Sequence, residues 1–348
     1  MGIRWNHTVY KYPWTSLIAY YITKPEGRSN LMKSDLDKDI MVSVYCATYN
    51  HEKYIVKALD SILMQKVNFS LEILVGEDCS TDNTRAVLKK YESQHPGRVT
   101  VFYRDHNMNK EPIKNARDLK MRCRGKYVIA LEGDDYWTDV NKLQIEVDFL
   151  EAHPEYIAVA HNCIVVDADS KPTGEQFPEC KEEEYTFAHY TTGIMPGQTT
   201  TVLTRNYYRD HILDTSFVDL SIMPGDRRLY FTLLSNGRVY CIQKAMSAYR
   251  HITNGGASYS ANLTRNYHKS LEWYTAQLEY AVKINNPDAI KCAELLYCLT
   301  VRDAMKRKEI KISEGLKLIK KIKNKYRTFF LMGKRDINRF ILHKKLDI

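Results

Sequence analysis

The chain lacks long apolar runs and clustered cysteines. No window approaches the roughly 18 apolar residues that a membrane-spanning helix needs, and the longest early apolar run, residues 16–22, also lacks the cleavage site of a signal peptide. The eight cysteines are scattered, without a Cys-x-x-Cys pair. A zinc site and a disulfide framework are therefore disfavoured, and reduced thiols in a cytoplasmic compartment are expected.

The chain also lacks an even distribution of charge. Its net charge is +9, but residues 301–348 contain 16 Lys and Arg against 5 Asp and Glu, a net of +11. The other 300 residues carry 35 basic and 37 acidic side chains, a net of −2. The basic character therefore belongs to a C-terminal tail, and the body of the protein is close to neutral.

The composition is otherwise that of a globular protein, with 44% hydrophobic and 27% charged residues among 348. That length accommodates one large domain with an appendage, or two domains. Residues 1–40 mix aromatic residues with a polar, linker-like stretch. From residue 41 onward, short apolar runs alternate with segments of helical periodicity.

The alternation predicts βαβ units and a mainly parallel sheet. The expected strands are residues 42–47, 71–76, 99–103 and 127–131, with helices between them. Because the crossovers are right-handed, the loops that follow the strands should lie at one edge of the sheet. We therefore expect the polar loops 48–53, 77–84 and 132–139 to converge there.

The second half of the sequence predicts further strands and a helical end. A helix should begin near residue 223 with Asp226 in its first turn, and it should end at Asn236-Gly237. The pattern is helical from about residue 263 onward. The additional strands that we expect are residues 157–166, 198–204, 239–242 and 247–249.

Three carboxylates, Glu132, Asp134 and Asp135, lie within four positions directly after a buried strand. Like charges this close repel one another, so a cation should sit among them, most simply a divalent metal with oxygen ligands. Gly133 lets the backbone turn here, and Thr138 or Asp139 can cap the following helix. The alternative interpretation is a solvated acidic turn.

A second polar loop follows the strand at residues 71–76. The carboxylate of Asp78 and the hydroxyl of Ser80 could form hydrogen bonds with the N–H of a heterocycle or with a ribose. The alternative is an Asx-turn that only shapes the loop.

The order of these motifs resembles the family 2 glycosyltransferases of the GT-A fold, of the bacterial surface-polysaccharide type. The resemblance rests on Thr48-Tyr-Asn after the first strand, on residues 77–84 after the second, and on residues 125–137 with Glu132-Gly-Asp-Asp-Tyr-Trp. It covers about residues 41–258. It implies an α/β, Rossmann-like GT-A fold with a mainly parallel sheet and flanking helices, followed here by a basic helical extension.

The resemblance implies roles for residues of the first half. The acidic cluster would be the metal-binding motif for Mn²⁺ or Mg²⁺, with Glu132 replacing the commoner Asp and with Asp134 or Asp135 as the ligand. Asp78 would recognise the uracil edge of a UDP-sugar. Lys114 lies in a segment that borders the donor in similar proteins, although a surface role is open. The remaining residues expected to bind the donor are Thr48, Tyr49, Asn50, Ser80, Asn115, Glu132 and Asp134.

In the second half, the resemblance makes Asp226 the base that takes the proton of the acceptor hydroxyl in an inverting transfer. The alternative is that Asp226 only caps its helix. Gln198 and Thr199 would neighbour the acceptor. Arg250 and His251 fall where similar enzymes carry an Arg-x-His near the diphosphate or metal, but here the two residues are adjacent.

The predicted division is an N-terminal extension over 1–40, a glycosyltransferase domain over 41–260 with a donor half (41–140) and an acceptor half (141–260), and a basic helical region over 261–348. This region could lie on anionic lipid at the inner face of the plasma membrane, next to a lipid-linked acceptor, or form a cap with a solvated lysine face.

Two other functions are alternatives to a glycosyltransferase. A nucleotidyltransferase that makes a nucleotide sugar should carry a Gly-rich basic loop after the first strand, and residues 48–52 lack it. A nucleic-acid-binding protein could act through the basic tail, but the near-neutral body and the absence of a recognisable binding module argue against nucleic acid as a partner.

Overall fold

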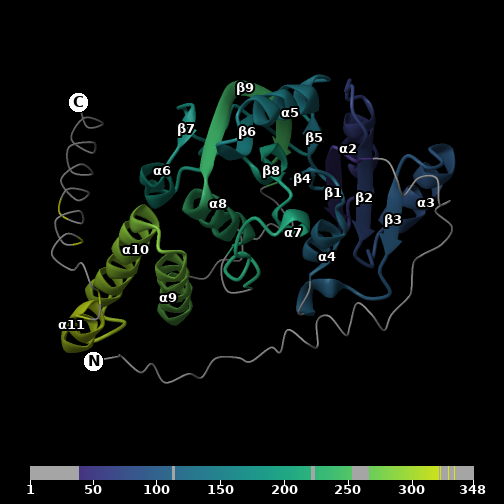
Figure 1. Ribbon diagram of the computed structural model, residues 1–348. Helices are drawn as coiled ribbons and strands as arrows, with labels where there is room; N and C mark the ends of the chain where they lie inside the picture. Colours follow the sequence, from purple (N-terminus) through teal and green to yellow (C-terminus); the bar gives the residue numbers. More distant parts are fainter. Residues whose placement is uncertain are drawn as a thin grey trace. The chain divides into compact units, whose positions relative to one another are not determined.

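The computed structural model describes residues 39–111, 114–220, 224–252 and 266–320, together with residues 322, 328 and 333. The residues from Ile40 onward form one unit. Residues 1–38 of the expected N-terminal extension and most of the basic tail beyond residue 320 lie outside the described residues. Figure 1 gives the arrangement of the elements.

The first half of the sheet is parallel, as predicted, and runs in the order β3-β2-β1-β4. Because the strands point the same way, the loops that follow them emerge at one edge. The strands are β1 (Val42–Thr48), β2 (Leu71–Glu77), β3 (Thr100–Tyr103) and β4 (Tyr127–Ala130). The helical segments between them are α2 (Ile55–Leu63), α3 (Thr84–Gln94), η2 (Met108–Lys110) and α4 (Asn115–Arg122).

The second half of the sheet continues from β4 through an antiparallel pairing with β8, and then in the order β6-β9-β5. β6 and β9 are parallel neighbours, whereas β5 and β7 pair antiparallel with β9. The strands are β5 (Tyr136–Trp137), β6 (Tyr156–Val166), β7 (Glu184–Tyr185), β8 (Leu203–Arg205) and β9 (Arg238–Arg250). The mixed but mainly parallel sheet with flanking helices confirms the predicted fold class.

Three local predictions were wrong. The strand expected over 198–204 is instead a 3₁₀ turn, η3 (Thr199–Thr201), followed by the short β8. The side-chain oxygen of Gln198 accepts hydrogen bonds from both the main-chain N and the hydroxyl of Thr200, each at 2.6 Å. These bonds offer the backbone an alternative to a strand ladder.

The two closing strands expected over 239–242 and 247–249 form the single strand β9. Ile242 pairs with His161, and Ala245 pairs with the next residue, Asn162, so Gln243 and Lys244 form a bulge. A bulge absorbs extra residues without ending the strand, which explains why the polar interruption in the sequence is not a break in the structure.

The helix after the acidic cluster, α5 (Lys142–Ala152), is capped by neither Thr138 nor Asp139. Its N-cap is Asn141, without a side-chain capping hydrogen bond. The Asp139 carboxylate instead accepts from the Asn141 N–H at 2.8 Å and pairs with Lys244 at 2.6 Å. Asp139 therefore ties the start of the helix to the bulge of β9.

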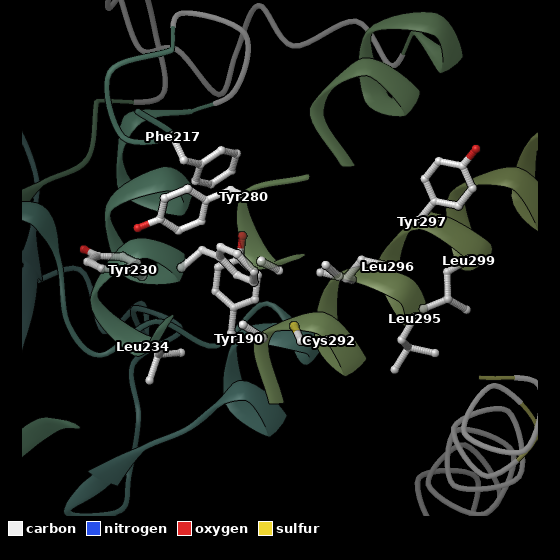
Figure 2. Packing of buried hydrophobic residues seen from close by; sticks show 14 of the residues in the cluster. Tyr190, Phe217, Tyr230, Leu234, Tyr280, Cys292, Leu295, Leu296, Tyr297 and Leu299 are labelled. Atoms are coloured by element: carbon white, nitrogen blue, oxygen red, sulfur yellow. The ribbon is translucent and has the colours of Figure 1, made fainter. Parts of the chain in front are cut away.

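Two large hydrophobic cores support the sheet. One packs mainly residues of the parallel strands β1 to β4 and their helices, and it also includes Tyr156, Val159 and Leu203 from β6 and β8. The other spans Ile157 to Ile322, and it joins β6 and β9 to the C-terminal helices; Figure 2 shows Tyr190, Tyr280 and Cys292 packing together in it. The helices are α6 (Phe187–Thr192), α7 (Tyr207–Asp210), α8 (Gly225–Asn236), α9 (Tyr267–Ile284), α10 (Pro287–Lys306) and α11 (Ile312–Lys320). The helical region therefore shares its core with the preceding half of the sheet.

Candidate functional site

The loops after β1 and β2 interlock. The Asp78 N–H donates to the Thr48 carbonyl at 3.0 Å, and the Asn50 N–H donates to the Ser80 hydroxyl at 3.1 Å. The Asn50 side chain accepts from the Thr81 N–H at 2.8 Å. Asn50 holds this position with φ 58°, in the left-handed region that Asn tolerates. The structure thus brings together the loop residues that the sequence predicted to surround a nucleotide base.

Asp78 is 6% exposed at the edge of this loop pair. One carboxylate oxygen accepts from the Met108 N–H at 2.8 Å, and the Asn107 side chain donates to the Asp78 carbonyl. Burial raises the pKa of the Asp78 carboxyl, against the opposing effects of the Met108 N–H and Arg104. These contacts fix the carboxylate in one orientation. Tyr49, between Thr48 and Asn50 in the loop that follows β1, is half-buried.

Asn115 is buried against the end of β2. It is 4% exposed, its amide donates to the Gly76 carbonyl at 2.8 Å, and its oxygen accepts from Arg104 at 3.0 Å. Arg104 also pairs with Asp118 at 2.6 Å. Asn115 therefore holds Arg104 and the end of β2, whereas the neighbouring Lys114 is exposed.

The acidic loop after β4 gathers its carboxylates as predicted. Oxygen atoms of Glu132, Asp134 and Asp135 all lie within 4.8 Å of one another. Glu132 as a whole residue is exposed to solvent. Partial desolvation of its carboxyl group by the surrounding protein, followed by the charges of Asp134 and Asp226, raises the pKa of Glu132 to about 7.

Asp135 differs from its two neighbours because its carboxylate is already occupied. It is 1% exposed; one oxygen accepts from the Arg250 N–H at 2.7 Å and the other from the Gln198 amide at 3.0 Å. Burial, with the charges of Asp134 and Glu132, raises its pKa well above the ordinary value. Asp135 therefore links the acidic loop to β9 and to η3, and Gln198 is likewise 4% exposed.

The Arg250 side chain also holds the acidic loop, through a main-chain carbonyl of that loop. Its guanidinium donates to the Asp134 carbonyl at 2.8 Å and to the Asp167 and Ala168 carbonyls at 2.6 and 2.9 Å. It also lies 4.3 Å from the centre of the Tyr54 ring. A planar guanidinium can serve several acceptors at once. In this arrangement the Arg250 side chain, 4% exposed, is committed to main-chain carbonyls.

His251 points to a different partner. Its Nδ1 lies 2.7 Å from a carboxylate oxygen of Glu175, and its ring stacks near Tyr249. The main-chain N–H of His251 donates to the Val166 carbonyl at 2.9 Å. A role of Arg250 or His251 near a diphosphate or metal remains a prediction.

His51 is a neighbour of the acidic cluster that sequence reasoning missed. Its Nε2 lies 3.9 Å from an Asp134 carboxylate oxygen, and its Nδ1 lies 3.2 Å from the Thr48 hydroxyl. Burial lowers the pKa of the imidazole, although Asp134 and Asp82 oppose this shift. The available signal was its place in the same β1 loop as Thr48 and Asn50.

Asp226 lies in the first turn of α8. It lies close enough to raise the pKa of Glu132, and it raises that of Tyr230 as well. The helix N-cap is Pro224, and the Asp226 carboxylate accepts only from the adjacent Arg227 N–H among the hydrogen bonds of the described residues. Thr199, partly exposed, contacts Tyr230 next to it.

The donor set at the acidic loop fits a divalent cation. Three carboxylates with oxygens within 4.8 Å offer the oxygen ligands that Mg²⁺ and Mn²⁺ accept. Glu132 and Asp134 are accessible, whereas both oxygens of Asp135 already accept hydrogen bonds. A cation here would relieve the repulsion that raises the pKa of Glu132.

Comparisons with known proteins agree with this geometry. A family model described as glycosyl transferase family 2 matches residues 43–211. An uncharacterized protein of Mycobacterium tuberculosis is 29% identical over 214 residues, which are 62% of this chain and 60% of that protein. The chain thus spans about three fifths of such a relative. The chondroitin synthase of Escherichia coli is 32% identical over 120 residues, 34% of this chain and 16% of the relative.

The fold is shared with solved structures. The crystal structure of residues 1–349 of S. aureus TarS in complex with UDP-GlcNAc matches with a TM-score of 0.56 and 18% identity. The match covers 83% of this chain and 81% of that one. At this level of identity the likeness shows the GT-A fold.

The Arg250 clamp generates a stability prediction. Arg250 is itself buried and its guanidinium donates to three main-chain carbonyls, so we expect Arg250→Met to lower the free energy of unfolding by about 2–4 kcal/mol. Arg250→Lys should recover only part of this loss, because an ammonium cannot reproduce the planar fork. Urea unfolding measures both variants.

The matched control is His251→Gln, the adjacent residue with a half-exposed side chain. We expect it to change the free energy of unfolding by no more than about 0.5 kcal/mol. Equal stabilities of Arg250→Met and the unmodified protein would contradict the clamp.

Proposed function

We propose that this chain, which belongs to glycosyl transferase family 2 through residues 43–211, transfers a sugar from a nucleotide-diphosphate donor to a saccharide hydroxyl with inversion at the anomeric carbon. The observation that carries the proposal is the cluster of Glu132, Asp134 and Asp135 after β4, whose oxygens lie within 4.8 Å of one another. Asp226 at the start of α8 accompanies it, near enough for its charge to raise the pKa of Glu132. Such a pair provides a place for the leaving group and a base for the acceptor.

The donor in this proposal is a UDP-sugar, and its base lies against the interlocked β1 and β2 loops. Asp78 supplies a fixed carboxylate acceptor for a heterocycle N–H. The Ser80 hydroxyl, which accepts from Asn50, keeps its own hydrogen to donate. Support for uridine comes from S. aureus TarS, whose structure is a complex with UDP-GlcNAc. The loop residues proposed to border the base are Thr48, Tyr49 and Asn50.

Glu132 and Asp134 would hold a divalent metal, Mn²⁺ or Mg²⁺, next to the donor. When bound, the metal neutralises the charge that develops on the diphosphate as the glycosidic bond breaks. Asp135, also expected as a ligand, would act by holding the loop in place, because its two oxygens accept from Arg250 and Gln198. Asn115 would act indirectly, because it accepts a hydrogen bond from Arg104 and donates one to the Gly76 carbonyl near the end of β2.

Asp226 would act as the general base. In an inverting transfer one base takes the proton of the acceptor hydroxyl as its oxygen attacks the anomeric carbon. Support comes from the nearness of Asp226 to the acidic cluster, where its charge raises the pKa of Glu132, and from its standing outside the group of clustered carboxylates. Thr199 and Gln198, on η3 and just before it, are the proposed acceptor-side neighbours.

The acceptor in this proposal is a saccharide carried on a lipid, which requires contact with a membrane surface. On α11, Ile312 and Leu316 are 69% and 49% exposed, and the surrounding lysines are Lys311, Lys317 and Lys320. Exposed apolar side chains beside three exposed lysines and one exposed acid, Glu314, suit an anionic lipid surface. Within the described ranges, no helix has both the length and the apolar character to cross a bilayer.

The base assignment predicts a separation of binding from turnover. Asp226→Asn keeps the size of the side chain but removes its basicity, so we expect the rate of UDP release from UDP-GlcNAc to fall about 10²–10⁴-fold. The Kd of UDP-GlcNAc, measured by calorimetry with Mn²⁺, should stay within about twofold. A panel of other UDP-sugars extends the test if UDP-GlcNAc does not bind.

The matched control is Asp288→Asn, an exposed acid in the first turn of α10, which should leave both quantities unchanged. An unaltered rate in Asp226→Asn, or a loss of donor binding equal to the loss of rate, would refute the assignment of the base.

The membrane proposal predicts binding to anionic vesicles through α11. Ile312→Ser combined with Leu316→Ser removes two exposed apolar side chains, and we expect the partition coefficient onto phosphatidylglycerol vesicles to fall at least about tenfold. Vesicle flotation measures the bound fraction. Val282→Ser, on α9 and with 57% exposure of the original side chain, is the control; equal flotation of all three proteins would exclude α11 as the contact.

A further inference from the structure

The imidazole of His51 faces the acidic cluster from the β1 loop. Its Nε2 lies 3.9 Å from an Asp134 carboxylate oxygen. Among the residues that the structure describes, no other histidine has a ring nitrogen within 4.0 Å of a carboxylate in this cluster. His251, the histidine that the family resemblance associates with the metal, contacts Glu175 instead.

The fold holds the His51 ring against the acidic loop. A Cβ atom at position 133 would lie 2.7 Å from His51 Nδ1 and 2.7 Å from the Thr48 hydroxyl, so only glycine permits this contact. The main-chain N–H of His51 donates to the Thr84 hydroxyl at 2.8 Å. Both the backbone and the ring of His51 are therefore positioned by neighbouring loops.

The separation between the two side chains suits a shared ion. A distance of 3.9 Å between His51 Nε2 and Asp134 Oδ2 is too long for a hydrogen bond. It is shorter than twice a metal–ligand bond of about 2.1 Å, so one ion can contact both atoms. The Thr48 hydroxyl at Nδ1 is the kind of second partner that fixes the tautomer of a metal-bound histidine, with the proton on Nδ1 and the lone pair on Nε2.

We infer that His51 Nε2 is a nitrogen ligand of the divalent ion held by Glu132 and Asp134; this inference rests on the metal site of the proposed function. The ligand set then includes an imidazole beside the Asp134 carboxylate. Mg²⁺ prefers oxygen ligands, whereas imidazole is a ligand of transition metals. His51 therefore biases the site toward Mn²⁺ over Mg²⁺.

The test is the electron spin-echo spectrum of bound Mn²⁺, with and without UDP, which reports ¹⁴N nuclei coordinated to the ion. We expect ¹⁴N modulation in the unmodified protein and its loss in His51→Gln. Titrations should show the ratio of Mn²⁺ to Mg²⁺ affinity falling about tenfold in His51→Gln, because a nitrogen ligand is lost. His106→Gln, which changes an exposed histidine paired with Glu111, is the control and should keep the modulation.

The outcomes separate this inference from the proposed function. Bound Mn²⁺ that is lost in Asp134→Asn but shows no ¹⁴N modulation in the unmodified protein would overturn the role of His51 and leave the metal site standing. If the unmodified protein bound no Mn²⁺, with or without UDP, both the metal site and the His51 ligand would be wrong. Modulation retained in His51→Gln would also overturn the inference.

Discussion

The buried carboxylate of Asp135 joins the two halves of the site. One oxygen accepts from the Arg250 N–H at the end of β9, and the other accepts from the Gln198 amide ahead of η3. The Arg250 guanidinium then holds the Asp134 carbonyl, so the acidic loop is fixed through both its side chain and its main chain. This junction ties the acidic loop, which follows β4, to β9 and to the residue ahead of η3.

The same junction concentrates negative charge at the acidic loop. The Arg250 guanidinium contacts this loop through the Asp134 carbonyl, and the pKa of Glu132 is raised to about 7. A site of this kind gains most from a ligand that brings positive charge. A divalent ion with a nucleotide diphosphate would supply that charge and give the Glu132 and Asp134 carboxylates a shared partner.

The sequence predicted what local periodicity and loop composition determine. The parallel strands β1 to β4 and the convergence of the loops after β1, β2 and β4 follow from apolar runs and polar turns along the chain. It could not predict contacts between distant segments. Asp135 looks like a metal ligand in the sequence, and only the arrival of Gln198 and Arg250 from other elements shows that its oxygens are occupied. His51 was missed for the same reason, since its relation to Asp134 arises from the packing of Gly133.

The central claim is that the acidic loop and the interlocked β1 and β2 loops bind a nucleotide-diphosphate sugar together with a metal. The most direct measurement is calorimetric titration of the unmodified protein with UDP-GlcNAc and with UDP, in Mn²⁺ and in EDTA. We predict saturable binding in Mn²⁺ that weakens at least about tenfold in EDTA, which corresponds to about 1.4 kcal/mol. Equal affinity in Mn²⁺ and in EDTA would contradict the claim that a metal forms part of the donor site.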